Sequence, residues 1–306
     1  MSRRGTSQFR DTLRQYAAGI AQDTASAIAD FIAPRVPVGI ATGMFKKFSD
    51  KNSFQIYDTA RALGGPANRI KFEATDGTFN CEPQALEIPI DDAERDKSGD
   101  AQDGLEEAKA RTVVISGGLA RENKVLSVVK DSIAPVSGLG VWSDAAKDPI
   151  AEIDQILYDI AIATGMMPNA LVLGLGAWRI VKNHAKVLAR RPGADNAAVD
   201  LGQFAAMLLN PQIEIKVGIL SKDTNKWGKG KEAVNIVGGE VFAFLRSANP
   251  TQYDPSFAKT FSVGNNSVES VRTYRDEQCR SDILAVDWSE DVQVVAPTCA
   301  RRISLS

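Results

Sequence analysis

The feature that most constrains this chain is a long run of apolar residues at helical spacing. Over residues 104–131 the steps alternate between three and four, through Leu105, Ala108, Thr112, Ile115, Leu119, Glu122, Leu126 and Val129. This spacing predicts one helix, roughly 40 Å long, whose seam packs along an extended surface. We expect Gly117 and Gly118 to bend or interrupt the helix, and Glu122 to need a polar partner on the seam.

The N-terminal segment has helical patterning but no core of its own. Phe9, Leu13, Tyr16 and Ile20 recur at steps of four, three and four, which predicts an amphipathic helix within the first 33 residues. The two prolines of APRVPVG, residues 33–39, then force extended backbone. A helix followed by an extended arm needs a partner surface. This end of the chain is also locally basic, through Arg3, Arg4, Arg10 and Arg14.

Residues 51–96 are predicted to form strands joined by long connections. Asp76-Gly77 lies between RIKFEA and TFNCE, which is a strong hairpin signal. A hairpin of this size cannot bury both faces alone, so we expect the body or another subunit to cover one of them. Acidic residues then accumulate over 91–107, where we expect a solvated turn that leads into a helix N-terminus. The alternative is a paired-carboxylate or calcium site, but the DxDxDG spacing of a calcium loop is missing.

The remaining elements predict an α+β chain. Asp148-Pro149 opens a second helix, with aspartate as the N-cap and proline at the first helical position. Further along we expect a buried strand at 170–174, helices at 177–191 and 200–210, and a strand at 213–220. Beyond residue 232 the chain is predicted to be largely antiparallel strand.

Composition sets the broad class. A length of 306 residues predicts about two structural units, and a net charge of −2 gives no overall attraction to nucleic acid. No run of about 18 apolar residues occurs and no apolar core follows the first arginines. We therefore expect a soluble protein made in the cytosol, without a membrane partner.

The sequence gives little evidence for a catalytic site, a metal site or a cofactor-binding site. His184 is the one histidine, and Cys81, Cys279 and Cys299 form no CxxC pair, which excludes most triad and zinc arrangements. GLGAWR (174–179) lacks the third glycine of a dinucleotide turn, and no βαβ pattern with an acidic residue about 20 positions on is predicted after it, so helix-start packing explains it better. KWGKGKE (226–232) lacks parts of a phosphate loop and is interpreted as a basic surface turn, with phosphate contact as the minor alternative. We expect His184 to be exposed or partly packed on a helix, and we predict no enzyme activity, no metal and no cofactor.

Five strings in this order resemble the major capsid proteins of tailed bacteriophages, those of the Hong Kong 97 fold. IADFIAPRVPVG (28–39) resembles the arm, TFNCEPQALEIPIDDAERD (78–96) the return strand of the extended loop, and GLEEAKARTVVISGGLARENKVLSVV (104–129) the spine helix. The closest stretch is DPIAEIDQILYDIAIATGMMPNALVLGLGAWRIVKNHAKVLAR (148–190). SVESVRTYRDEQCRSDILAVDW (267–288), with the DVQVVAPTCARRI that follows, resembles the closing strands. The resemblance covers about residues 28–303.

The resemblance implies a wedge-shaped subunit of four parts. These are an N-terminal arm (1–50), an extended β-hairpin loop (51–96), a peripheral domain with the spine helix (97–135 and 263–306) and an axial domain (136–262). Copies would self-assemble through hexamers and pentamers into an icosahedral phage head around double-stranded DNA. The implied partners are other copies, a separate scaffolding protein, a portal and, in some heads, a decoration protein. The implied location is the virion, after assembly in the cytoplasm of the host bacterium.

Two departures and two alternatives accompany this resemblance. Some relatives carry a scaffolding region of about a hundred residues before the arm, and some cross-link a lysine to an asparagine between subunits. Here about 27 residues precede the match, so we expect a separate scaffolding protein or assembly without one. Nothing marks Lys51 or Lys71 as reactive, so we expect non-covalent contacts between subunits. Arg3, Arg4, Arg10 and Arg14 are predicted to face DNA or, equally well, to pair with a neighbouring subunit. The alternatives are an encapsulin-like compartment that encloses cargo enzymes and a cytosolic α/β enzyme.

Overall fold

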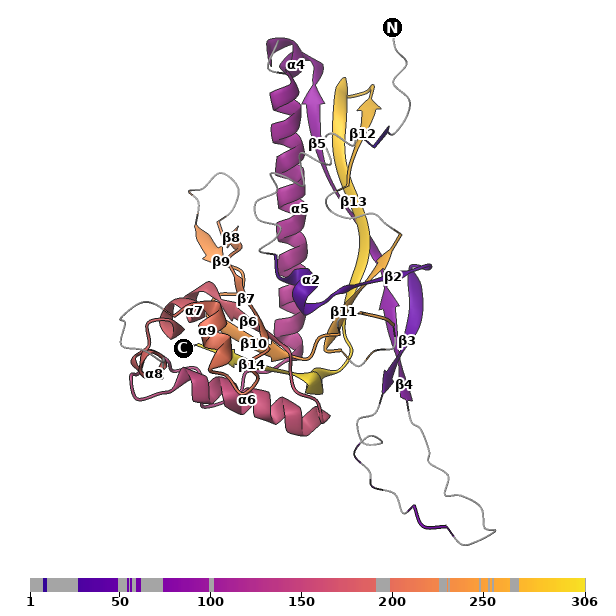
Figure 1. Ribbon diagram of the computed structural model, residues 1–306. Helices are drawn as coiled ribbons and strands as arrows, with labels where there is room; N and C mark the ends of the chain where they lie inside the picture. Colours follow the sequence, from indigo (N-terminus) through magenta and orange to yellow (C-terminus); the bar gives the residue numbers. More distant parts are fainter. Residues whose placement is uncertain are drawn as a thin grey trace.

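The computed structural model of the chain describes residues 8–9, 27–48, 54, 56, 59–61, 74–98, 102–190, 199–225, 230, 232–247, 249–252, 254, 256–264 and 270–305. A six-stranded sheet runs along one long helix, and a four-stranded sheet with its own helices gathers at the C-terminal end of that helix (Figure 1). A two-stranded ribbon leaves the body on the side of the six-stranded sheet (Figure 1). The α+β class predicted from the sequence is confirmed.

The predicted long helix is present as α5 (Gln102–Ser132), which has 31 residues and follows the short helix α4 (Asp92–Ser98). At 1.5 Å per residue α5 is about 46 Å long. The expected interruption at Gly117-Gly118 is wrong, because the helix continues through both residues, and a bend at these glycines stays a prediction. Asp92 and Glu94 lie in the first turn of α4, so the acidic run opens a helix as predicted.

The two halves of α5 bury different faces. In the N-terminal half, Ala110, Val113 and Val114 pack against a cluster from the six-stranded sheet. In the C-terminal half, Val125 and Leu126 are buried against the arm and the four-stranded sheet. The helix therefore joins two hydrophobic cores, and its buried stripe turns around its axis between them.

The six-stranded sheet is centred on β13 (Ser281–Val294), which is 14 residues long. On one side β13 pairs antiparallel with β5 (Glu82–Asp91). On the other side it pairs antiparallel with β12 (Val271–Asp276) and then with β11 (Ala258–Val263). Both outer strands on this side come from the N-terminal region: β1 (Gln8–Phe9) is antiparallel to β12, and β2 (Arg35–Val38) is parallel to β11.

The four-stranded sheet has the order β14 (Ala300–Ser304), β10 (Glu240–Phe244), β6 (Ala170–Gly174), β7 (Glu214–Gly218). Its helices are α6 (Pro149–Thr164), α7 (Leu175–Val181), α8 (Ala185–Ala189) and α9 (Leu201–Ala206). Their apolar sides form one core with the sheet, which includes Trp142, Ile153, Leu157, Leu171 and Phe204. The described residues also include a small antiparallel pair of β8 (Ser221–Asp223) and β9 (Ala233–Asn235) and a 3-10 turn, η3 (Pro297–Cys299). Across the described residues, no helix has the length and apolar character needed to cross a membrane.

The Asp76-Gly77 hairpin prediction is wrong. These two residues lie inside β4 (Ala74–Asn80), which pairs antiparallel with β3 (Thr42–Phe48) to form the ribbon. Gly77 is opposite Phe45, and a Cβ on Gly77 would lie 2.6 Å from the tip of the Phe45 ring. The glycine therefore makes room for an aromatic ring from the partner strand instead of forming a turn.

Three further local predictions need correction. Phe9 is in a strand and not in a helix, and residues 10–26 of the predicted amphipathic helix lie outside the described residues. The predicted helix 177–191 is divided into α7 and α8, because His184 between them has extended backbone. β6 and β7 are parallel strands connected through α7, α8 and α9, so a βαβ arrangement does follow GLGAWR.

Candidate functional site

No group of three or more metal-ligating side chains occurs among the described residues. His184 is buried and caps α8, where its Nδ1 accepts the backbone N–H of Lys186 at 3.3 Å. The expectation of a histidine exposed or partly packed within a helix is therefore wrong. Gly174 of GLGAWR is needed for packing, since a Cβ there would lie 1.9 Å from the carbonyl oxygen of Gly238. These residues have structural roles, and the features that stand out are three polar and aromatic junctions.

The first junction holds the arm on the long helix. Helix α2 (Ala29–Ile32) is one turn long, and the buried N–H groups of Ile28 and Ala29 at its start have no acceptor within the helix. The Glu122 carboxylate supplies an acceptor for each of two N–H groups: Oε1 accepts the N–H of Ile28 at 3.0 Å, and Oε2 accepts the N–H of Ala29 at 2.8 Å. Glu122 is only 2% exposed, and this burial raises its pKa although the two backbone bonds act in the opposite direction. The partner that the sequence required for Glu122 is therefore the backbone of the arm.

Arg121 secures the same turn from the other side. Its Nε donates to Oε2 of Glu290 on β13 at 2.8 Å, and its Nη2 donates to Oδ1 of Asp30 on α2 at 2.6 Å. Arg121 is 5% exposed. Burial alone would lower the pKa of Arg121, but the two carboxylates outweigh it and raise that pKa. The guanidinium thus ties together the arm, the long helix and the central strand.

Phe31 of α2 reaches the four-stranded sheet. Its ring meets that of Phe244 edge-on, with 5.7 Å between ring centroids. Lys216 and Arg246 place their cationic groups 4.8 Å and 4.7 Å from the Phe31 ring centroid. This short helix therefore contacts α5 and both sheets, which fixes the direction in which the arm leaves the body.

The second junction is the base of the ribbon. Phe45 of β3 and Phe79 of β4 both pack on Phe261 of β11, at centroid distances of 5.2 Å and 4.5 Å. Cys81, just after β4, donates its S–H to the carbonyl oxygen of Phe261 at 3.3 Å, and burial raises its pKa. All four side chains are buried. The ribbon is therefore rigidly attached at its base, whereas its far end projects away from the body (Figure 1).

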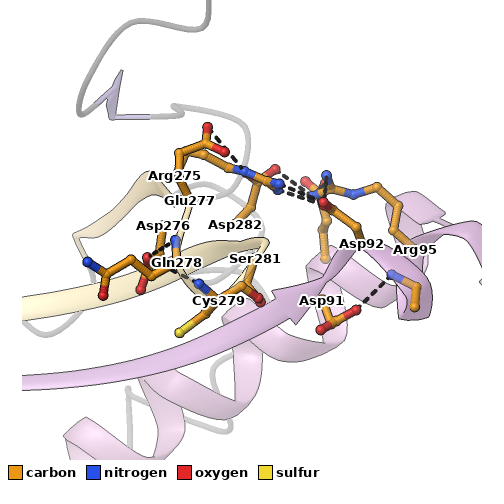
Figure 2. Close-up of polar contacts among 12 residues, drawn as sticks. Asp91, Asp92, Arg95, Arg275, Asp276, Glu277, Gln278, Cys279, Ser281 and Asp282 are labelled. Carbon is orange, nitrogen blue, oxygen red and sulfur yellow. Dashed lines mark hydrogen bonds and ion pairs between the residues drawn. The ribbon is translucent and has the colours of Figure 1, made fainter.

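The third junction closes the distal tip of the six-stranded sheet, where β12 turns into β13 beside α4. Figure 2 shows Arg275 of β12 directed at Asp92, and the guanidinium donates to both carboxylate oxygens at 2.6 Å. This paired donation lowers the pKa of Asp92. Arg95 donates to Asp282 at 2.6 Å, and Asp276 accepts the backbone N–H of Gln278 at 2.9 Å. The acidic run predicted as a solvated turn is thus partly neutralised by arginines.

The predicted seam of the long helix is divided by the structure. Leu126 and Val129 are buried, while Leu105, Ile115 and Leu119 are half-buried. Ala108 and Thr112 are exposed, because the six-stranded sheet covers the opposite side of that half. Arg3, Arg4, Arg10 and Arg14 lie outside the described residues. A functional role of the seam stays a prediction. Contact of these arginines with DNA or with a neighbouring subunit also stays a prediction.

Comparison with known proteins shows which proteins this chain is similar to in sequence. No protein-family profile matches the chain. The chain is 29% identical over 178 residues to the major capsid protein of Pseudomonas phage JBD67, and this alignment spans 56% of each protein, little more than half of that relative. It is 26% identical over 266 residues to the major capsid protein of Burkholderia phage BcepMu, across 83% of each.

Solved structures share the fold over nearly the whole chain. A phage-related protein from Bordetella bronchiseptica matches with a TM-score of 0.71 at 22% identity, covering 98% of this chain and 97% of that one. A structure from Mycobacterium phage Che8 matches with a TM-score of 0.54 at 15% identity, covering 99% and 93%. An encapsulin from Synechococcus elongatus matches with a TM-score of 0.58 at 8% identity, covering 93% and 89%. The Hong Kong 97-type fold and the resemblance to phage major capsid proteins are confirmed.

Proposed function

We propose that this chain is the major coat protein of a phage head, a structural protein and not an enzyme. The observation that carries this is a body with two projections, the arm and the ribbon, each fixed at its root by buried contacts. Such projections bury little surface within one subunit and are suited to contacts between copies. Sequence similarity to two phage major capsid proteins agrees with this function.

The finer assembly scheme belongs to the same proposal. Copies associate through hexamers and pentamers into an icosahedral shell, with the four-part division 1–50, 51–96, 97–135 with 263–306, and 136–262. A separate scaffolding protein and a portal take part, a decoration protein binds some heads, and assembly occurs in the host cytoplasm. The rigid roots of the arm and ribbon support this scheme, because each copy must present its projections in a defined direction.

Contact with packaged double-stranded DNA is proposed for Arg3, Arg4, Arg10 and Arg14. Such contact would be electrostatic and independent of sequence. Replacing all four with serine should reduce the amount of DNA that the shells retain. The remaining DNA should also be released at a lower salt concentration. A control with the same loss of charge replaces four exposed arginines elsewhere, Arg61, Arg111, Arg179 and Arg280, with serine. Unchanged DNA retention in the four-serine variant would instead favour arginine contacts to neighbouring subunits.

Electron microscopy of the protein expressed alone and with its scaffolding protein tests the coat function. We expect closed shells, or tubes and sheets built from rings, in the high-mass fraction. A chain that stays monomeric or dimeric in both preparations, across protein and salt concentrations, contradicts the proposal.

A compartment that encloses enzymes is the second candidate, since an encapsulin shares the fold. The contents of purified shells distinguish the two, because nucleic acid favours a phage head and a bound cargo protein favours a compartment. The likeness to phage coat proteins at the level of sequence favours the head. A cytosolic enzyme is least supported, and nucleotide or metal binding by the purified chain would revive it.

A further inference from the structure

One side of α6 carries large apolar side chains that the fold leaves uncovered. Ile153, Ile156 and Ile160 pack in the core of the four-stranded sheet and are fully buried. Tyr158 and Ile162 lie on the other side of the helix, where they are 54% and 63% exposed. The outer side of a surface helix normally carries charged and polar residues. These two side chains instead form the middle of a larger apolar patch.

Two connecting segments extend this patch. Met166 and Met167 follow the end of α6, and both are exposed. Leu209, also exposed, lies beside the helix, because its backbone N–H donates to Oδ1 of Asp154 at 2.8 Å. A group of exposed apolar side chains marks an interaction surface, whereas single ones do not. We call this surface the α6 face, and it consists of Tyr158, Ile162, Met166, Met167 and Leu209.

The α6 face already holds an aromatic ring at one end. Gly165 is seven residues after Tyr158 and therefore lies on the same side of the helix. A Cβ on Gly165 would be 3.6 Å from the ring of Phe54, which lies between β3 and β4 in the sequence. Phe54 keeps 49% of its surface exposed, so this contact covers only the end of the face. The face can thus bind an apolar side chain from a segment that is distant in the sequence.

The charges beside the α6 face are negative. Asp154 and Asp159 lie on its two flanks, and α6 contains no lysine or arginine. The C-terminal end of α6, next to the two methionines, is the negative end of the helix dipole, and no basic residue lies in the last turn. Arg190 is at the opposite end of the helix, where it pairs with Asp148 at 2.5 Å. The α6 face therefore favours a partner that carries positive charge beside its apolar side chains.

The size of the α6 face suits a reversible contact. At roughly 200 Å² for each large side chain, about half of it exposed, the five residues present about 500 Å². A stable interface buries about 800 Å² on each partner, so this face alone is small for a permanent contact between copies. Methionine side chains adapt to partners of different shape. These features favour a weak partner that binds and leaves.

We propose that the α6 face is the docking site for the scaffolding protein, through an amphipathic helix whose apolar side is bordered by lysine or arginine. This inference rests on the proposed coat function, in which a separate scaffolding protein takes part. Such a helix places apolar side chains at helical spacing along the face and basic side chains near Asp154 and Asp159. A scaffolding protein is needed only during assembly, so a small contact that can be released fits its role.

Binding of the scaffolding protein to the unassembled subunit tests this proposal. The test variant carries Tyr158→Ser and Ile162→Ser, and the matched control carries Ile219→Ser and Val234→Ser, which removes two exposed apolar side chains elsewhere. We expect the test variant to bind at least about tenfold more weakly and the control to bind like the original chain. Analytical ultracentrifugation measures binding, and urea unfolding shows that each variant is folded. Asp159→Lys is a second, single substitution that should weaken binding through charge alone.

Two designed peptides test the chemistry of the partner without the scaffolding protein. One is an amphipathic helix of leucine and lysine, and the other has glutamate in place of lysine. We expect the original chain to bind the lysine peptide more tightly than the glutamate peptide, and the double-serine variant to lose this preference. Equal binding of both peptides by the original chain overturns the part of the proposal that concerns charge.

Assembly separates this inference from the coat function. Scaffolding protein that binds the original chain and the double-serine variant equally overturns the docking site, and shells formed by both leave the coat function intact. Double-serine shells that form normally with scaffolding protein but dissociate at a lower urea concentration assign the face to contacts between copies and also overturn the docking site. A failure of the original chain to form shells, with scaffolding protein supplied, overturns both.

Discussion

At Glu122, two carboxylate oxygens cap a helix that lies 93 and 94 residues earlier in the chain. A cap supplied from so far away makes the start of α2 dependent on the tertiary fold, because the N-cap residue of α2, Ile28, offers no side-chain acceptor. The neighbouring Arg121 adds a buried charge pair with Glu290. Two consecutive residues of α5 thus decide where the arm begins.

Substituting Arg121→Ala should strongly destabilise the subunit. The change leaves the Glu290 carboxylate buried without the guanidinium that pairs with it, and breaking a buried pair in this way costs about 3–5 kcal/mol. Urea unfolding of the unassembled subunit, followed by tryptophan fluorescence, measures the loss. Arg111→Ala, at an exposed position of the same helix, is the control and should change stability by less than about 0.5 kcal/mol. A loss below about 1 kcal/mol for Arg121→Ala would contradict the role given to this pair.

The pH dependence of stability should reveal the buried carboxyl group of Glu122. Its pKa is raised by burial, so the folded state holds the proton more tightly than the unfolded chain. Above the raised pKa the charged form carries its full penalty, and this penalty falls as pH decreases towards the unfolded pKa near about 4.3. Glu122→Gln removes this dependence.

We therefore expect the difference in unfolding free energy, original chain minus Glu122→Gln, to be greater at pH 5 than at pH 8. Urea titrations of both proteins at the two pH values measure the four free energies of unfolding that this comparison needs. A difference that is equal at both pH values, or larger at pH 8, would show that burial does not dominate the ionisation of this group.

At the sheet tip, Arg275→Gln should raise the pKa of Asp92 towards its ordinary value. The bonds from Arg275 are the main cause of the lowered pKa, so this pair stabilises the fold above the unfolded pKa of aspartate and the contribution is lost as pH falls through the lowered pKa. Carboxyl NMR titration measures the change. Asp276 is an internal control, because the backbone N–H of Gln278 is the main cause of its lowered pKa. Equal shifts at both carboxyls would point to a general loss of structure.

At the scale of elements, the ribbon depends on the fit of aromatic rings over glycines. Gly77→Ala places a Cβ 2.6 Å from Cζ of Phe45 and should cost about 1–3 kcal/mol of stability, since Phe45 is buried against Phe261 and has little room to move. Thermal unfolding measures this loss. Gly118→Ala in α5 is the matched control, because a Cβ there meets nothing within 4 Å and should stabilise the helix by up to about 1 kcal/mol. Similar effects of the two substitutions would exclude the ring contact as the cause.

The halves of α5 show how an element can be predicted while its packing is not. Its length follows from spacing within the helix, but its buried side is set by β5 and β13 in one half and by α2 and the four-stranded sheet in the other. Apolar residues occur on both sides of the N-terminal half, so periodicity alone does not identify the covered side. The spacing predicted the element, and the resemblance to capsid proteins then identified it with their spine helix.

At the scale of the whole molecule, folding of the subunit and stability of the shell should respond differently to loss of the first nine residues. Deleting residues 1–9 removes β1, whose two residue pairings contribute little to the fold of one subunit. We expect the urea midpoint of the isolated subunit to be unchanged, whereas shells should dissociate at a lower urea concentration. Light scattering follows shell dissociation and fluorescence follows unfolding. A parallel fall in both midpoints would mean that β1 serves the subunit and not the contacts between copies.

The sequence by itself determined the elements whose signals lie within one helical turn or one strand. Asp148 accepts the N–H groups of Ile150 and Ala151, Gly165 ends α6 with φ of 69°, and Asp200 with Gln203 forms the capping box of α9. Such signals are readable because all the interacting groups are adjacent in sequence. The tertiary structure alone decided that Asp76-Gly77 lies within a strand, that Glu122 caps the arm, and that Arg275 reaches Asp92. These outcomes depend on groups from about 30 to more than 180 residues apart, and spacing along a single chain carries no information about which distant segment will fill a neighbouring position.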